Sequence, residues 1–499
     1  MNSTQIMALV IILLYMAATV ALGLFVSSRK KSKTENQSND DFLMASKSLG
    51  PVMLASTLFA ANTGGASTTG IATNVFTYGI SAGWYAIAAG IGFVLVSFIA
   101  PYFRNAQANT VPEIISKRYG KKSHIFTAIT SIAALFMATG AQIIATASII
   151  NVVTGVEFKI AAIITTVVVI IYTMVGGFKS VTAANMMHVL FITIGMTIAM
   201  VIIVNNSAVG GFSVLFEKAK TVTDNSGNNL DLISMTKIGL PTIIGYIAMY
   251  FMTFPTGQEI VQTYCSAKDG KSAKVGSIIA GVLSAVYAMV PAIIGLVAYV
   301  CIDGFAANGA QKNALAESTI TFAPAVVAGI VLAAIVAATM SSASGNMIGT
   351  ATMFTNDIFR PYINKGVKDD NKEIWISRVT MAVVGIVGLT VALTASNIIS
   401  VMMGAFALRS AGPFAAFICA IFYKNVTKRA GFISIVSGTI VAAIWIYGLN
   451  TPWGLNSMVP GGIIAFAVIF LVSALDRKMG IKPAPEIEFT EPAAVVEFK

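Results

Sequence analysis

Residues 51–79 read PVMLASTLFAANTGGASTTGIATNVFTYG, an apolar segment that is interrupted near its middle. Gly64 and Gly65 stand about 14 residues into the segment, beside the polar residues Asn62 and Thr63. A bilayer core about 30 Å thick needs roughly 20 apolar residues of helix, so the segment is long enough to cross one. Each glycine lowers helix stability by about 1 kcal/mol, and the pair therefore favours unwinding near the membrane midplane.

A second apolar segment, residues 238–264, carries a comparable break. Phe254-Pro255-Thr256-Gly257 lies about 17 residues into it, where the proline removes a helical hydrogen bond. Unpaired backbone groups in hydrocarbon cost several kcal/mol each unless they line a cavity or bind a ligand. Two such breaks, five spans apart, predict a secondary transporter built from inverted repeats, with its site between them. The alternative for either break alone is a kink that permits close helix packing.

The whole composition agrees with a membrane protein. Of 499 residues, 56% are hydrophobic and 11% are charged, whereas a soluble domain carries about 25% charged residues. This excludes a soluble enzyme. Two histidines and three cysteines without CxxC spacing give no metal cluster or disulfide framework. The net charge of +11 comes from short loops between apolar runs, so we expect no nucleic-acid partner.

Apolar stretches of spanning length predict an all-α integral membrane protein with about thirteen transmembrane helices. The expected spans are 5–27, 51–79, 82–103, 124–152, 159–177, 180–205, 238–264, 274–302, 321–358, 376–398, 400–423, 430–448 and 459–476.

The distribution of basic residues predicts the orientation of these spans. If the N-terminus is outside, the loops on the cytoplasmic side hold 26 Lys and Arg and the outer loops hold 5. Cytoplasmic loops carry the excess of basic residues in membrane proteins, so the N-terminus is predicted outside and the C-terminus in the cytoplasm. The tail, residues 477–499, is rich in Pro and Glu and is predicted to be disordered.

A polar cluster interrupts the span at 321–358. Ala338, Ser341 and Ser342 stand at i, i+3 and i+4, so they share one helix face. Hydroxyl and carbonyl oxygens suit a hard cation such as sodium. Small residues on one face also permit close helix packing, and the pattern alone leaves both interpretations open.

Several short motifs in order along the chain resemble the sodium:solute symporter family. They are Asp41-Phe42, Ser48-Leu49-Gly50, Ser56-Thr57-Leu58-Phe59-Ala60-Ala61-Asn62, Thr110-Val111-Pro112-Glu113, Arg118-Tyr119-Gly120, Gly176-Gly177, Gln258 with Gln262 and Ser266-Ala267-Lys268, and Ser341-Ser342 with Thr355-Asn356-Asp357.

The resemblance implies a LeuT-type core of two inverted five-helix repeats, in which the first and sixth core helices are broken. The repeats are expected at 51–205 and 238–423. The remaining segments are a leading helix and loop at 1–50, an extracellular loop at 206–237, two trailing helices at 424–476 and the cytoplasmic tail at 477–499.

The resemblance also implies a sodium site between the first and eighth core helices. Its ligands are expected to be the backbone carbonyls of Ala60, Thr63 and Ala338 and the hydroxyls of Ser341 and Ser342. Some family members have an aspartate, linked to a further sodium, where Asn185 stands here. Ser344 is present, but without that carboxylate we expect one sodium ion.

Positions that contact solute in the family correspond to Asn62, Gly64, Ser67 and Gln258, with Gln142 as a further candidate. Two charges, Glu259 and Arg409, lie within spans, where an ionisable residue is expected to be functional. Either one receives a charged group of the solute, or the two pair with each other or cap exposed carbonyls.

The expected function is sodium-coupled import of a small polar solute, with an amino acid or small carboxylate favoured, by alternating access in the cell membrane. Proton coupling through Glu259 or His188 is one alternative, and a sugar or polyamine as solute is another. A channel or a transporter-like sensor is less favoured. The expected partners are the solute and the lipid bilayer, with no obligate protein partner.

Overall fold

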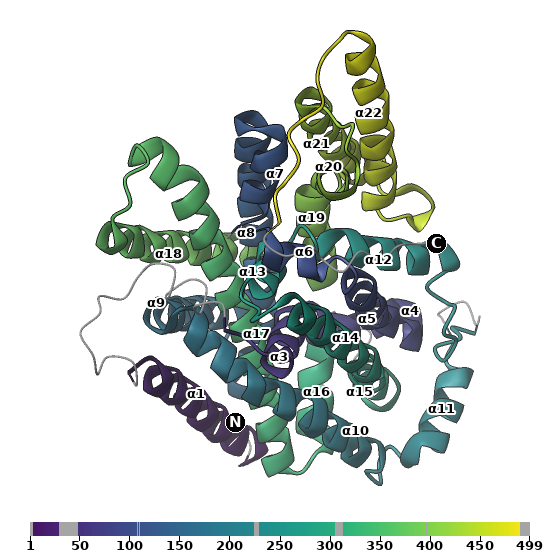
Figure 1. Cartoon of the computed structure of the whole chain (residues 1–499). Coiled ribbons are helices and arrows are strands. Elements are labelled where there is room, and N and C mark those ends of the chain that lie inside the picture. Colours follow the sequence, from purple (N-terminus) through teal and green to yellow (C-terminus); the bar gives the residue numbers. More distant parts are fainter. Residues whose placement is uncertain are drawn as a thin grey trace.

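The structure of the protein is a computed structural model that describes residues 3–28, 48–106, 108, 110–223, 229–304, 313–395 and 397–489. The described residues form a helical bundle, with two isolated β-bridges (Figure 1). The predicted all-α class is therefore confirmed. The Asp41-Phe42 motif, residues 490–499 and the burial of Gly176 and Gly177 lie outside what the structure describes.

The first half of the described chain contains α1 (Ser3–Ser28), α3 (Pro51–Asn62), η2 (Ala66–Gly70), α4 (Ile71–Tyr78), η3 (Gly79–Gly83), α5 (Trp84–Val96), α6 (Ala100–Asn105), α7 (Val111–Tyr119), α8 (Lys121–Thr154), α9 (Phe158–Leu190), η4 (Phe191–Gly195), α10 (Met196–Val204) and α11 (Gly211–Thr221).

The second half contains α12 (Leu240–Thr253), α13 (Gln258–Cys265), α14 (Gly270–Tyr287), α15 (Met289–Cys301), α16 (Ala314–Phe322), α17 (Ala325–Met353), η6 (Phe354–Ile363), α18 (Asp370–Thr394), α19 (Ile398–Ser410), α20 (Pro413–Phe422), α21 (Lys428–Ala443), η7 (Ile444–Gly448), η8 (Pro452–Gly454) and α22 (Met458–Lys478).

By length and hydropathy, eight helices of the described residues can cross a membrane, or nine if one bent pair counts as a span. Shorter apolar helices lie at other expected spans, namely Ser3–Thr19, Pro51–Asn62, Phe158–Ile171 and Leu240–Thr253. The structure therefore supports a multi-pass membrane protein, and the count of thirteen crossings stays a prediction.

Both predicted helix breaks are present. α3 ends at Asn62, and its C-cap residue Thr63 leaves the helical conformation with φ −89° and ψ 51°. The chain then bends and continues as the π-helix η2. α12 ends at Thr253, and the helix resumes as α13 only at Gln258. Glycine in the first break and proline in the second lower helix stability there, as the sequence indicates.

The predicted loop between residues 177 and 180 is wrong. α9 is helical from Phe158 to Leu190, through Gly176, Gly177 and Lys179. Two glycines cost a helix only about 1 kcal/mol each, and no proline lies in α9 to end it.

One bend was not expected from the sequence. α19 and α20 meet at 44°, within the stretch predicted as a single span at 400–423. Pro413 begins α20, and it lacks the N–H that would continue the helix. At the preceding residue, Gly412, an added Cβ would collide with the Ile435 backbone, so glycine allows α21 to pack against the bend.

The C-terminal tail is ordered as far as the structure describes it, so the prediction of disorder is wrong for residues 481–489. The Ala484 N–H donates to the Val426 carbonyl at 2.7 Å, and Ile487 is buried. The Phe489 ring packs edge-to-face against Tyr102, with centroids 5.4 Å apart. The apolar residues between the prolines and glutamates hold the tail against the bundle.

Helix α17 occupies the middle of the bundle (Figure 1). Helices α1, α8, α9 and α18 pack along it, and its residues from Ala328 to Met353 are nearly all buried. Alanine, glycine and serine make up much of this stretch, which lets neighbouring helices approach closely. The centre of the bundle therefore contains the serine cluster and, from α3, the first break.

Candidate functional site

The predicted sodium position lies where the end of α3 faces α17. The Ser342 hydroxyl donates to the Ala60 carbonyl at 2.9 Å, and both residues are buried. Thr63 caps α3, and Ala338 lies one turn before Ser342 on α17, both also buried. The fold thus brings together two of the five predicted ligands by direct contact and places the others on the same two helix segments.

Ser341 points toward a different helix. Its hydroxyl contacts the Asn185 carboxamide oxygen of α9. Ser344 also faces α9, where its hydroxyl is 2.8 Å from the Thr173 hydroxyl. The serine cluster therefore has two sides. Ser342 faces the α3 break, and Ser341 and Ser344 face α9.

The donor set fits a monovalent cation better than a divalent one. The oxygens at the α3 and α17 contact are neutral carbonyls and hydroxyls. Within the described residues, no group of three or more His, Cys, Asp or Glu side chains is placed to hold a metal ion. Neutral oxygens supply too little charge to hold a doubly charged ion against water, whereas they suit sodium.

Gln142 of α8 joins this position to the unwound backbone. Its side-chain oxygen accepts a hydrogen bond from the Gly65 N–H at 2.6 Å, one of the donors that the break in α3 releases. Gly64 fits between two side chains, because an added Cβ would lie 2.7 Å from the Ser342 hydroxyl and would also collide with Gln142. A larger residue at position 64 would force the Gln142 and Ser342 side chains to shift.

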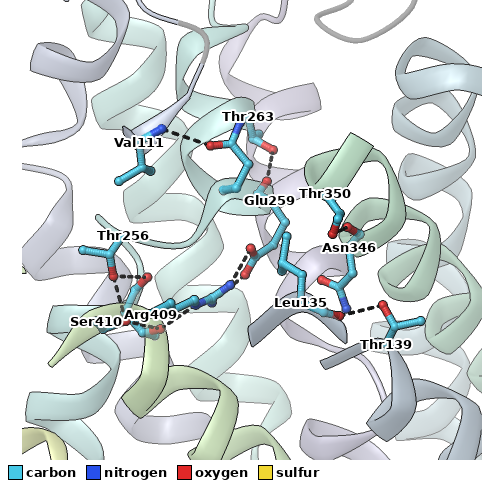
Figure 2. Close-up of polar contacts among 12 residues, drawn as sticks. Val111, Leu135, Thr139, Thr256, Glu259, Thr263, Asn346, Thr350, Arg409 and Ser410 are labelled. Atoms are coloured by element: carbon cyan, nitrogen blue, oxygen red, sulfur yellow. Dashed lines mark hydrogen bonds and ion pairs between the residues drawn. The ribbon is translucent and has the colours of Figure 1, made fainter. Parts of the chain in front are cut away.

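The second break carries a buried ion pair. Glu259, in the first turn of α13, and Arg409 of α19 form two parallel contacts of 2.7 Å (Figure 2). Their side chains are 10% and 2% exposed, respectively. The Arg409 Nε donates to the Thr253 hydroxyl at 3.2 Å, and its guanidinium lies 5.0 Å from the centre of the Phe406 ring. Glu259 and Arg409 therefore pair with each other, which is one of the alternatives that the sequence left open.

Gly257 makes room for this ion pair. A Cβ at this position would lie 2.7 Å from Arg409 Nη2 and 3.0 Å from Glu259 Oε1. The non-helical turn at residues 254–257 thus brings the backbone against the guanidinium. Bidentate pairing is the strongest geometry for these two groups, and it neutralises both charges inside the bundle.

A cavity lies between the two breaks. It is lined by Ala61, Asn62, Ala66, Tyr85, Gln142, Phe254, Glu259, Ile260, Asn346, Met402, Phe406 and Arg409. The Asn62 side-chain nitrogen is buried and has no hydrogen-bond partner among the described residues. Such a group is available to a bound molecule.

Four of the seven residues predicted to bind solute line the cavity: Asn62, Gln142, Glu259 and Arg409. Gly64, Ser67 and Gln258 are not among its lining residues. The Ser67 hydroxyl donates to the Asn62 carbonyl at 2.9 Å. The Gln258 side-chain oxygen accepts from the Val111 N–H of α7 at 3.1 Å and so faces away from the cavity.

Sequence reasoning missed most of the cavity wall. Tyr85, Met402 and Phe406 come from apolar spans, where nothing in the sequence separates a cavity residue from one that packs. Phe254 begins the second break, which was predicted to lie at the site. Asn346 had a usable signal. It follows Ser342 by four residues, so it shares that helix face, and it is polar within a span.

Comparison with known proteins agrees with this geometry. The osmoregulated proline transporter of Bacillus subtilis is 24% identical over 455 residues, covering 88% of this chain and 90% of that protein. The sodium/glucose cotransporter of Vibrio parahaemolyticus is 25% identical over 462 residues, covering 85% and 82%. The sodium/proline symporter of Staphylococcus aureus is 25% identical over 472 residues, covering 90% of each chain.

Solved structures share the fold. A Na⁺-coupled sialic acid symporter in a substrate-bound, outward-open state superposes with a TM-score of 0.76 at 18% identity, covering 96% of this chain and 99% of that one. MhsT in complex with L-phenylalanine gives a TM-score of 0.55 at 12% identity, covering 86% and 98%. These superpositions show that the fold is of the LeuT type. The relatives named above are transporters, and with the family match below they show that the protein is a transporter and not an enzyme.

A sequence model of the Sodium:solute symporter family matches residues 42–438. The match spans both breaks, the serine cluster and the ion pair. The chain therefore belongs to the sodium:solute symporter family.

Proposed function

We propose that the protein couples the inward movement of sodium to the import of a small zwitterionic solute, such as an amino acid, across the cell membrane. The observation that carries this proposal is the cavity itself, which has the Glu259–Arg409 pair on one side and the α3 break on the other. The predicted inverted repeats at 51–205 and 238–423 would alternate the access of this cavity between the two sides of the membrane.

The sodium ion is expected to bind at the contact of α3 and α17. Ala60, Thr63 and Ala338 would offer carbonyl oxygens, and Ser341 and Ser342 would offer hydroxyls. In its present geometry Ser342 already bridges the two helices through Ala60. An ion at the same place would strengthen that bridge, and it shifts the conformational equilibrium only if it binds the outward and inward states unequally.

The driving force is sufficient with one ion. Each sodium that enters through 100 mV releases about 2.3 kcal/mol, and a tenfold concentration gradient adds about 1.4 kcal/mol. Together these support accumulation of a neutral solute by several hundredfold. The Asn185 amide in place of a carboxylate favours this single-ion stoichiometry.

The ion pair favours a solute that carries both charges. A simple carboxylate would engage Arg409 and leave Glu259 buried without its partner, and a simple amine would do the reverse. Breaking a buried pair in this way costs about 3–5 kcal/mol. A zwitterion supplies a partner to each side chain, carboxylate to Arg409 and ammonium to Glu259. Phe254, Ile260 and Met402 would receive its apolar part.

A neutral sugar is the second candidate. Three carboxamide side chains, Asn62, Gln142 and Asn346, line the cavity and suit hydroxyl groups. A sugar would leave the ion pair intact. One relative is named as a sodium/glucose cotransporter, whereas two others are named for proline.

Uptake into proteoliposomes tests both candidates. The protein is reconstituted, a sodium gradient is imposed, and radiolabelled L-proline, L-phenylalanine, D-glucose and acetate are supplied separately. We expect sodium-dependent accumulation of an amino acid, and competition by other zwitterions but not by acetate. Accumulation of glucose alone would favour the second candidate. Uptake that follows a proton gradient in sodium-free buffer would contradict sodium coupling.

A further inference from the structure

Gln258 and Glu259 are adjacent residues that reach in opposite directions. Glu259 lines the cavity and pairs with Arg409 (Figure 2). Gln258 is fully buried and accepts a hydrogen bond from the Val111 N–H. Both stand in the first turn of α13, an eight-residue helix that follows the non-helical turn at residues 254–257. A short rigid helix after a turn moves as a unit, so a displacement of Glu259 also displaces Gln258.

The helix that Gln258 holds, α7, lies away from the cavity on the predicted cytoplasmic side. The Thr110 hydroxyl, at the N-cap of α7, donates to Asp357 Oδ1 at 2.9 Å, and His124 Nε2 lies 2.8 Å from the same oxygen. Asp357 follows the cavity residue Asn346 by eleven residues and lies in η6, the π-helix that continues α17, which places it roughly 16 Å farther along. These contacts join α7 to η6 and η6 to α8.

The other end of α7 is fixed to α20. Arg118 is 1% exposed, and its Nη2 donates to the carbonyls of Tyr423 and Lys424, both at 3.0 Å. The Tyr119 hydroxyl donates to the Ala416 carbonyl at 2.8 Å. These carbonyls follow the last turn of α20, and their partial negative charge stabilises the buried guanidinium. α7 therefore bridges α13, η6 and α20, and we name this helix with its contacts the inner gate.

We propose that Gln258 is a positioning residue that couples the solute cavity to the inner gate. When solute exchanges partners with Glu259, α13 shifts, and the hydrogen bond from the Val111 N–H to Gln258 is lost. The gate helix then loses its bond to α13 and keeps its contacts at Thr110 and with α20, and the path from the cavity to the cytoplasm opens. Gln258 acts through the backbone of Val111 and does not touch the solute.

This inference rests on the proposed function. Its test uses sodium without any solute, so that its result can be read separately from that of the uptake experiment. Cys265, the last residue of α13, is 2% exposed and donates to the Phe103 carbonyl of α6 at 3.6 Å. In a Cys301→Ser, Cys419→Ser background it is the single cysteine and reports movement of α13. The probes are N-ethylmaleimide labelling of Cys265 and the leak of radioactive sodium into proteoliposomes without solute.

Two variants remove the same hydrogen bond from opposite sides. Gln258→Met deletes the acceptor and keeps the length of the side chain. Val111→Pro deletes the donor at the first position of α7, where proline is tolerated. Each variant leaves one buried hydrogen-bonding group without its partner, which destabilises the closed state. We therefore expect the labelling of Cys265 and the sodium leak to rise about tenfold in both variants. If one variant fails to fold, the other carries the test.

Gln262→Met is the matched control. Gln262 lies one turn along α13, is equally buried, and donates to the Thr352 hydroxyl of α17 at 3.4 Å. We expect its labelling and leak to stay near those of the background protein. Equal increases in Gln262→Met, or no increase in the folded Gln258 and Val111 variants, would overturn the proposal. If the wild-type protein shows no sodium-driven solute uptake, the proposed function is contradicted. The labelling of Cys265 remains a separate test of the role of Gln258.

Discussion

At the scale of residues, the choice of solute depends most on the pair formed by Glu259 and Arg409. Both side chains are nearly enclosed, and their two contacts of 2.7 Å satisfy each other's charge. A buried pair is weak evidence for stability, because desolvation offsets most of the attraction. The structure places this pair at the cavity wall, where a solute can compete for both partners.

Arg409→Gln should therefore destabilise the protein more than a double exchange does. The single substitution leaves the Glu259 carboxylate buried without its cation, at a cost of about 3–5 kcal/mol. Glu259→Gln combined with Arg409→Gln replaces two charges by two neutral amides and should recover most of the thermal stability. Thermal unfolding of the three proteins in detergent measures this, and equal melting temperatures for single and double variants would show that the charges are not coupled.

The same double variant separates stability from transport. If the pair receives a zwitterion, the recovered protein should still fail to accumulate L-proline or L-phenylalanine. If the double variant takes up solute at nearly the wild-type rate, the Glu259–Arg409 pair has only a structural role.

At the scale of helices, the two helix breaks position the residues of the candidate site. The first releases the Gly65 N–H to Gln142, and the second brings Gly257 against Arg409. Two side chains approach the backbone of the first break closely. At Gly64 a Cβ would collide with Gln142 and Ser342.

Gly64→Ala should accordingly reduce uptake by about tenfold or more while the protein still reaches the membrane, since overpacking of this kind costs about 1–3 kcal/mol. Gly345→Ala is the matched control, because nothing lies within 4 Å of an added Cβ on that residue of α17. Initial uptake rates of the two variants, normalised to protein in the vesicles, decide the point. Equal rates would mean that the close approach at Gly64 is dispensable.

The breaks were predictable and much of the rest was not. Gly64-Gly65 and Pro255 are local signals, and the structure interrupts helices at both. The bend between α19 and α20 has a local cause in Pro413, but the packing of α21 against Gly412 depends on Ile435, which follows Gly412 by 23 residues. The cavity face of Phe254 and the turn of Gln258 toward α7 likewise depend on neighbours that periodicity does not reveal.

For the whole molecule, the family and the fold follow from the match to residues 42–438 and from the superposition on a Na⁺-coupled sialic acid symporter. Orientation in the membrane rests on basic residues alone, with 26 Lys and Arg on the predicted inner side and 5 on the outer. If one span were misplaced, all later loops would change sides and the excess of Lys and Arg on the inner side would be lost. The excess therefore supports the assigned orientation.

Cysteine labelling in intact cells checks this orientation. Lys218→Cys lies on exposed α11 in the predicted outer loop, and Lys482→Cys lies in the exposed start of the tail. In a background without exposed native cysteines, a membrane-impermeant maleimide should label Lys218→Cys and not Lys482→Cys. Permeabilised cells give the positive control for the second site, and the reverse pattern would place the C-terminus outside.

The most direct test of sodium coupling is the sodium dependence of uptake in a serine variant. Initial uptake rates of L-proline or another transported amino acid are measured against sodium concentration for wild type, Ser341→Ala with Ser342→Ala, and Ser344→Ala as control. Ser344 bonds to Thr173 of α9, away from the α3 break. If sodium binds between α3 and α17, the double variant should need about tenfold more sodium or more, equivalent to at least about 1.4 kcal/mol, and the control should resemble wild type. An unchanged sodium requirement in the double variant would contradict the assigned ion site.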